Sequence, residues 1–142
     1  MTQVQDVMTR NPVTCYDSDL VFSAVEVMKR QDVGVVPIVD QRKRCIGVVT
    51  DRDIVLEVIY NQRDPKTTLL RDIAAKLLLT CQPDEDLDTA IQLMRSRQVK
   101  RIIVVDQHNR CIGILSEGDI AQKVGDKAKL GELGKGVYGG AR

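Results

Sequence analysis

Apolar residues in the first half of the chain follow two different spacings. Within Asp19–Gln31 they recur every three or four positions, as one face of an amphipathic helix requires; they are Leu20, Val21, Ala24, Val25 and Met28. Two short β-branched runs follow at Val35–Val39 and Cys45–Thr50, separated by a polar segment. These runs predict two buried strands joined by a hairpin. A second short helix is predicted at Asp53–Ile59.

The same order of elements occurs twice. When Asp6 is laid on Asp72, residues Asp6–Ile54 align with Asp72–Ile120 without a gap, and Arg44-Cys45-Ile46-Gly47 recurs as Arg110-Cys111-Ile112-Gly113. We infer an internal duplication. The second copy predicts a helix at 87–94, strands at Ile102–Val105 and Cys111–Ser116, and a closing helix at Asp119–Val124.

The predicted fold class is α/β (α+β), and each repeat runs β-α-β-β-α when its short lead-in is counted. Neither copy is expected to complete its sheet alone. We assign residues 1–60 to the first repeat, 61–69 to a polar linker that contains Pro65, and 70–124 to the second repeat. Residues 125–142 are rich in glycine and have no apolar period, so we expect a tail that is mobile unless a partner orders it.

Composition excludes several classes of function. The chain carries 21 basic and 20 acidic residues, and only 3% of its residues are aromatic, which argues against a nucleic-acid or membrane-surface binder. No apolar run approaches the length of a membrane span, and the amino terminus lacks the pattern of a signal peptide. We therefore expect a soluble, cytoplasmic protein.

No catalytic or metal-binding constellation is visible. The single histidine, His108, lies in a polar hairpin, and no nucleophile, base or metal-ligand spacing accompanies it. The four cysteines occupy two repeat-equivalent positions, as Cys15 and Cys81 and as Cys45 and Cys111. They favour small apolar packing residues over a metal site, with a redox switch as the minority alternative. We expect a protein that is not an enzyme and has no metal or catalytic cofactor.

The most specific motif lies where the hairpin meets the second helix of each repeat. Gly47-Val48-Val49-Thr50-Asp51-Arg52-Asp53 recurs as Gly113-Ile114-Leu115-Ser116-Glu117-Gly118-Asp119. A hydroxyl residue three positions before an acid predicts a capping box, in which each side chain binds the other residue's backbone amide.

This motif, together with the strand Val35-Val36-Pro37-Ile38-Val39-Asp40, resembles the CBS domain family. The resemblance covers Val4 to about Val124 and is strongest to stand-alone bacterial two-CBS proteins of the hypoxic response type. It implies two repeats packed about a pseudo-twofold axis as a Bateman module, with an adenine nucleotide in two clefts. Each cleft would combine the T/S-x-x-D of one repeat with the lead-in and first strand of the other.

The resemblance implies a first cleft with a basic rim. There, Asp53 would accept hydrogen bonds from the ribose hydroxyls, and Thr50 would contact ribose or phosphate. Adenine would lie among Val48, Leu78 and Leu79, and the phosphates would meet Arg71, Lys100 and Arg101. Arg52 is either a further phosphate contact or a surface residue of the first helical turn.

The second cleft would be poorer in charge, since Gly34-Val35 stands where the other repeat has Lys100-Arg101. Its candidate residues are Met8, Asn11, Val13, Val33, Gly34, Val35, Ile114, Ser116 and Asp119. A polyphosphate should therefore prefer the first cleft. Glu117 would repel phosphate if it faced the second.

Two functions remain open from the sequence. The first is a sensor in which AMP, ADP, ATP, NAD(H) or S-adenosylmethionine binds in the clefts and an unknown protein target reads the change. The second is a ligand-free homodimeric scaffold with vestigial clefts. A homodimer is expected in both cases.

Overall fold

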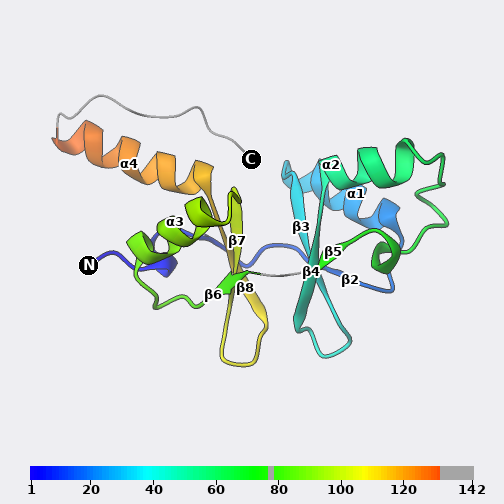
Figure 1. The fold of residues 1–142 in the computed structure, drawn as a ribbon, viewed down its shortest axis with the longest axis horizontal. Helices are drawn as coiled ribbons and strands as arrows, with labels where there is room; N and C mark the ends of the chain where they lie inside the picture. The colour runs from blue at the N-terminus through cyan, green and yellow to red at the C-terminus, as the bar shows by residue number, and fades with distance from the viewer. Residues whose placement is uncertain (77–78, 132–142) are drawn as a thin grey trace. The chain divides into compact units, whose positions relative to one another are not determined.

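The computed structural model describes residues 1–76 and 79–131, which form two compact units. Unit 1 contains residues 1–11, 79–106 and 112 onward, and unit 2 contains residues 12–76 and 107–111. Each unit is a mixed α/β structure built on a four-stranded sheet (Figure 1). The predicted fold class is confirmed.

Unit 2 holds the first repeat. Its sheet has the order β2-β3-β4-β5, with β2 and β3 parallel and the other pairs antiparallel. The hairpin strands have the predicted bounds. The elements are β2 (Cys15–Tyr16), α1 (Val21–Gln31), β3 (Val35–Val39), β4 (Cys45–Thr50), α2 (Asp51–Ile54), the π-helix η2 (Val55–Ile59), the 3-10 helix η3 (Leu70–Asp72) and β5 (Ala75–Lys76).

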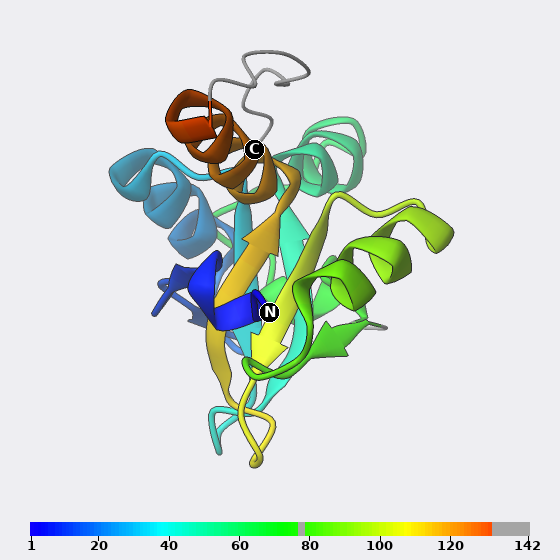
Figure 2. The same ribbon diagram turned by 90° about the vertical axis from the view of Figure 1, so that its left-hand side faces the viewer.

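Unit 1 holds the second repeat and has the sheet order β1-β8-β7-β6. Helices α3 and α4 cover the same face of this sheet (Figures 1 and 2). The elements are the 3-10 helix η1 (Val4–Asp6), β1 (Thr9–Arg10), β6 (Thr80–Cys81), α3 (Leu87–Ser96), β7 (Arg101–Val105), β8 (Cys111–Ser116) and α4 (Glu117–Gly131).

The lead-ins are exchanged between the repeats. Strand β1 belongs to the lead-in of the first repeat but pairs with β8 of the second, placing Thr9 opposite Ile114. Strand β5 belongs to the lead-in of the second repeat but pairs with β4 of the first, placing Ala75 opposite Val48. Each sheet therefore gains its fourth strand from the other repeat, which confirms that neither copy completes its sheet alone.

The same exchange caps the first helix of each repeat. Helices α1 and α3 have no side-chain hydrogen bond at their N-caps. Instead, the Val21 amide donates to the Thr68 carbonyl at 2.8 Å, and the Leu87 amide donates to the Thr2 carbonyl at 2.9 Å. Backbone carbonyls thus satisfy amides that a helix start leaves unpaired.

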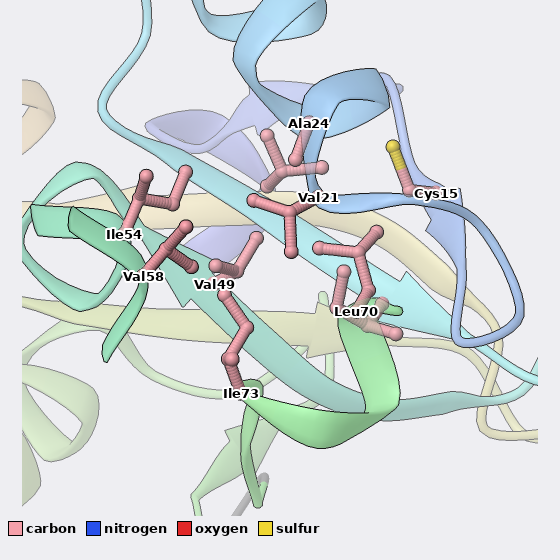
Figure 3. Packing of buried hydrophobic residues seen from close by; sticks show 10 residues of the cluster. Cys15, Val21, Ala24, Val49, Ile54, Val58, Leu70 and Ile73 are labelled. Carbon is pink, nitrogen blue, oxygen red and sulfur yellow. The ribbon is translucent and has the colours of Figure 1, made fainter. Parts of the chain in front are cut away.

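Each unit has its own apolar core. In unit 2, Val21 and Ala24 of α1 pack with Val49 of β4 and with Leu70 of the exchanged lead-in (Figure 3). Every residue of β3 is buried, as expected for a continuous apolar strand with both faces covered. The core of unit 1 repeats this pattern, with residues from η1, α3, β7 and β8.

The second helices differ from the predicted bounds. In the first repeat the helix starts at Asp51 rather than Asp53, because Thr50 is the N-cap. In the second, α4 starts at Glu117 and continues to Gly131, past the predicted end at Val124. The helix continues through Gly125, since a glycine inside a run of good helix formers costs only about 1 kcal/mol. The rest of the predicted tail lies outside the described residues.

Candidate functional site

Both T/S-x-x-D motifs form the predicted capping boxes. In unit 2, the Thr50 amide donates to Asp53 Oδ2 at 2.9 Å, and the Asp53 amide donates to Thr50 Oγ1 at 3.1 Å. In unit 1, the equivalent distances between Ser116 and Asp119 are 3.1 and 3.0 Å. The boxes fix each carboxylate at the junction of strand and helix while using one of its two oxygens.

The glycine of each motif allows the exchanged lead-in to approach. A Cβ on Gly47 would lie 2.6 Å from the backbone oxygen of Ala75, and a Cβ on Gly113 would lie 2.5 Å from Met8 Sδ. Glycine therefore lets the lead-in strands pair with β4 and β8, which end at Thr50 and Ser116.

The two carboxylates differ in their remaining oxygen. Thr9 of β1 donates its hydroxyl to Asp119 Oδ1 at 3.1 Å. The repeat-equivalent residue in β5 is Ala75, whose methyl group cannot donate. Among the residues that the structure describes, only the Thr50 amide donates to Asp53. The Asp53 carboxylate is thus more available to a ligand than that of Asp119.

Each unit brings together part of each predicted cleft, and the complete clefts remain a prediction. Unit 2 holds Val48, Thr50, Arg52, Asp53 and Arg71 of the first cleft, and Val13, Val33, Gly34 and Val35 of the second. Unit 1 holds Leu79, Lys100 and Arg101 of the first cleft, and Met8, Asn11, Ile114, Ser116 and Asp119 of the second. Leu78 lies outside the described residues.

The predicted phosphate ligands have different surroundings. Arg52 and Lys100 are exposed, and Arg101 is half-buried at the start of β7. Arg71 lies in η3, and its backbone amide donates to the Asp17 carbonyl at 3.0 Å, which holds the exchanged lead-in against the first repeat.

Lys100 lines a hollow that the sequence did not predict. The hollow measures about 320 Å³ and lies in unit 1; its lining residues are Ile91, Met94, Arg95, Gln98, Val99, Lys100, Glu117 and Ile120. Glu117 therefore faces this hollow together with Arg95 and Lys100. The hollow is thus lined by two basic side chains as well as by the negative charge of Glu117.

The cysteines separate into two kinds, which the sequence did not distinguish. Cys15 and Cys81 belong to the two apolar cores. Burial raises their thiol pKa values to about 11 and about 12, and the nearby carboxylates of Asp19 and Glu85 add to the shift. The Cys111 thiol, by contrast, hydrogen-bonds to Cys45 and lowers the pKa of Cys45, partly offset by burial.

Comparison with known proteins identifies the family. The family model described as the CBS domain matches the chain twice, at residues 4–60 and 70–126. The chain belongs to the CBS domain family. The resemblance inferred from the motif and its repeat is therefore confirmed.

Stand-alone CBS proteins are among its relatives. The CBS domain-containing protein YhcV of Bacillus subtilis is 35% identical over 121 residues, covering 85% of this chain and 84% of YhcV. Hypoxic response protein 1 of Mycobacterium tuberculosis is 30% identical over 129 residues, covering 90% of this chain and 89% of that protein. The chain spans 61% of the length of protein MK0525 of Methanopyrus kandleri, which is 29% identical.

Solved CBS pairs have the same fold. Hypoxic response protein I, in a structure with two coordinated zinc ions, has a TM-score of 0.77 and 28% identity over 85% of this chain and 98% of its own. The CBS domain pair of protein MJ0100, in complex with 5'-methylthioadenosine and S-adenosyl-L-methionine, has a TM-score of 0.79 and 24% identity over 89% of this chain and 98% of its own.

Within residues 1–76 and 79–131, no three His, Cys, Asp or Glu side chains are grouped to hold a metal ion. No helix in the described part of the CBS pair is long and apolar enough to cross a membrane.

Proposed function

We propose that this CBS pair is a regulatory protein that binds an adenine nucleotide or another adenosyl ligand in its clefts. The observation that carries the proposal is that each T/S-x-x-D motif is intact, and an exchanged lead-in strand lies beside it. Adenosyl ligands are bound by the CBS pair of MJ0100, whose fold this chain shares. The choice of ligand class here rests on the resemblance to the CBS family, and the motif supplies a carboxylate that can accept ribose hydroxyls.

The Asp carboxylate is the group that would recognise ribose. A carboxylate accepts hydrogen bonds only, and its two oxygens can meet the two vicinal hydroxyl donors of a ribose. Asp53 Oδ1 is open to such a donor, whereas Oδ2 accepts the capping amide. Val48 and Leu79 would supply apolar contacts to the base, and Arg71, Lys100 and Arg101 would bind phosphate.

Regulation would follow from differential binding. A ligand changes the conformation of a protein only to the extent that it binds one arrangement more tightly than another. Because each proposed cleft takes residues from both units, a bound ligand would favour one arrangement of the units. A protein partner would read that arrangement.

A panel of ligands tests the proposal. Thermal unfolding of the full chain is measured with AMP, ADP, ATP, NADH and S-adenosylmethionine, with GMP as the control for the base. At a hundred times its dissociation constant, a ligand that binds the native protein adds about 2.7 kcal/mol of stability. We expect at least one adenosyl ligand to raise the Tm and GMP to raise it less. A Tm that no adenosyl ligand changes would refute the sensor function.

A ligand-free homodimeric scaffold is the second candidate, and the surface of η2 favours it. Val55, Leu56, Ile59 and Tyr60 on and beside this helix expose 55%, 44%, 60% and 80% of their surface. Exposed apolar side chains gathered on one short segment are typical of an interaction surface. A Tm that rises with protein concentration but not with any ligand would support the scaffold over the sensor.

The two sites are expected to bind with unequal strength. A ligand at Asp119 would compete with Thr9 for Oδ1, whereas at Asp53 the equivalent residue, Ala75, offers no competing donor. One such bond contributes about 0.5–1.5 kcal/mol, or roughly two- to tenfold in affinity. Thr9→Ala should tighten binding at the Asp119 site by that factor, and Ala75→Thr should weaken binding at the Asp53 site.

Isothermal titration with the tightest adenosyl ligand of the panel measures both effects. Thr9→Ala is combined with Asp53→Asn, which removes binding at the first site, and Ala75→Thr is combined with Asp119→Asn, which removes binding at the second. The ligand affinity is then measured at one site at a time. Unchanged affinity in both pairs would show that the Thr9 hydroxyl does not compete with the ligand.

A further inference from the structure

Two thiols, one from each repeat, are in contact within unit 2. Arg44, before β4, pairs in antiparallel fashion with Arg110, before β8. The Cys45 amide donates to the Asn109 carbonyl at 2.8 Å, and Asn109 Nδ2 donates to the Cys45 carbonyl at 3.3 Å. The duplicated hairpins thus contribute equivalent residues to one short ribbon.

The register of this ribbon brings Cys45 and Cys111 together. Because Arg44 opposes Arg110, Cys45 opposes Asn109, and Cys111 is two residues further along the same strand. Diagonal residues on one face of an antiparallel pair lie about 7–8 Å apart, with their Cβ atoms somewhat closer. The side-chain hydrogen bond between Cys111 and Cys45 agrees with this placement.

The surroundings hold this pair in place. Asp40 accepts hydrogen bonds from the Arg44 amide at 2.9 Å and from Arg44 Nε at 2.8 Å. The Cys45 thiol also donates to the Gly47 carbonyl, with a sulfur-to-oxygen distance of 3.9 Å. Cys45 is 3% exposed, whereas Cys111 is half-buried, so solvent reaches the pair through Cys111.

We propose that Cys45 and Cys111 are a redox-active pair that a low-molecular-weight disulfide oxidises to an intramolecular disulfide. The Cys111 thiolate attacks one sulfur of the reagent, forming a mixed disulfide and releasing one reagent thiolate. The Cys45 thiolate then attacks Cys111 Sγ, breaking the mixed disulfide and releasing the second. The two cysteines lose two protons and two electrons, and the reagent gains them as two thiols.

The other two cysteines provide an internal contrast. The raised pKa values of Cys15 and Cys81 keep these thiols protonated near neutral pH, and the thiolate is the form that reacts. In the reduced pair, the hydrogen bond from the Cys111 side chain lowers the pKa of Cys45, which favours its thiolate. Oxidation is therefore selective for one pair.

The bond would act on both ligand motifs. It joins the first residue of β4 to the first residue of β8, and these strands end at Thr50 and Ser116. A crosslink at their starts restricts the movement of one strand relative to the other. This inference does not depend on the proposed ligand, because the thiol contact exists without it.

Oxidised glutathione tests the pair in the full chain. After incubation at pH 8, we expect a mass loss of about two hydrogen atoms and two of the four thiols protected from maleimide after unfolding. Peptide mapping should assign the bond to Cys45 and Cys111. The Tm should rise by roughly 5–15 °C, because the bond restricts the unfolded chain, and dithiothreitol should reverse the rise.

Matched variants make the result specific. Cys15→Ser with Cys81→Ser should still form the bond, whereas Cys111→Ser should form none, and Cys45→Ser should stop at a glutathione adduct on Cys111. Circular dichroism checks that each variant is folded. Four maleimide-reactive thiols after oxidation, a stable glutathione adduct on the unmodified chain, or a bond that involves Cys15 or Cys81 would overturn the proposal.

Discussion

Replacing Asp53 by asparagine is expected to weaken adenosyl-ligand binding at the first site by roughly a hundredfold or more. The carboxylate would accept hydrogen bonds from both ribose hydroxyls, and each charge-assisted bond contributes about 1.5–3 kcal/mol. Asparagine is uncharged and has one acceptor oxygen, which already accepts the Thr50 amide, and the NH2 group that replaces the other oxygen can only donate. Titration calorimetry with the adenosyl ligand measures the loss.

The capping function and the ligand function can be separated in this variant. Asparagine can still accept the Thr50 amide, so the Tm without ligand should change little. Asp51→Asn is the matched control, because Asp51 lies in the same turn, carries the same charge and binds the Arg52 amide. If Asp53→Asn binds the ligand as tightly as Asp51→Asn does, then Asp53 does not recognise ribose.

Replacing Gly47 by alanine is expected to lower the free energy of unfolding by about 3 kcal/mol, the upper part of the range for an overpacked site. The new Cβ would lie 2.6 Å from the Ala75 carbonyl oxygen. That atom belongs to the backbone of β5, which cannot retreat without disturbing its pairing with β4 at Gly47 and Val48. Urea unfolding followed by circular dichroism measures the change.

Gly113→Ala is the matched comparison at the equivalent position. Its nearest obstacle is Met8 Sδ, which lies near the end of a flexible side chain and can move, and the backbone oxygen of Thr9 is 3.1 Å away, farther than the 2.6 Å between a Cβ on Gly47 and the Ala75 oxygen. We expect a smaller loss of stability, about 1 kcal/mol. Equal losses in the two variants would mean that close approach of the exchanged strand does not explain the glycine at position 47.

The local elements followed from residues close to one another in the chain. Helical spacing predicted α1 with an end at Gln31, and the β-branched runs predicted β3 and β4 at their observed bounds. Both capping boxes are present as predicted, since their partners are three residues apart. The duplication predicted that the second repeat would reproduce these elements, and it does.

The candidate site was predicted less completely. Thr50, Asp53, Ser116 and Asp119 were identified because they form a short motif that occurs twice. The length of α4 was underestimated because Gly125 suggested an end where the helix continues. The hollow beside Lys100 was missed, because its walls come from residues 91–100 and from the start of α4, which are separate in sequence.

Periodicity and capping act over a few residues, and the repeat can be seen by comparing the sequence with itself. For this reason the sequence alone sufficed to predict most of the secondary structure and the CBS family. Two contacts that the sequence did not predict join distant residues: Thr9 binds Asp119, and Cys45 hydrogen-bonds to Cys111. Each depends on which strand pairs with which, and in what register. Side chains far apart in the sequence become neighbours only when the exchanged lead-ins and the hairpins pack together. These contacts were therefore determined by the tertiary structure and not by the sequence pattern.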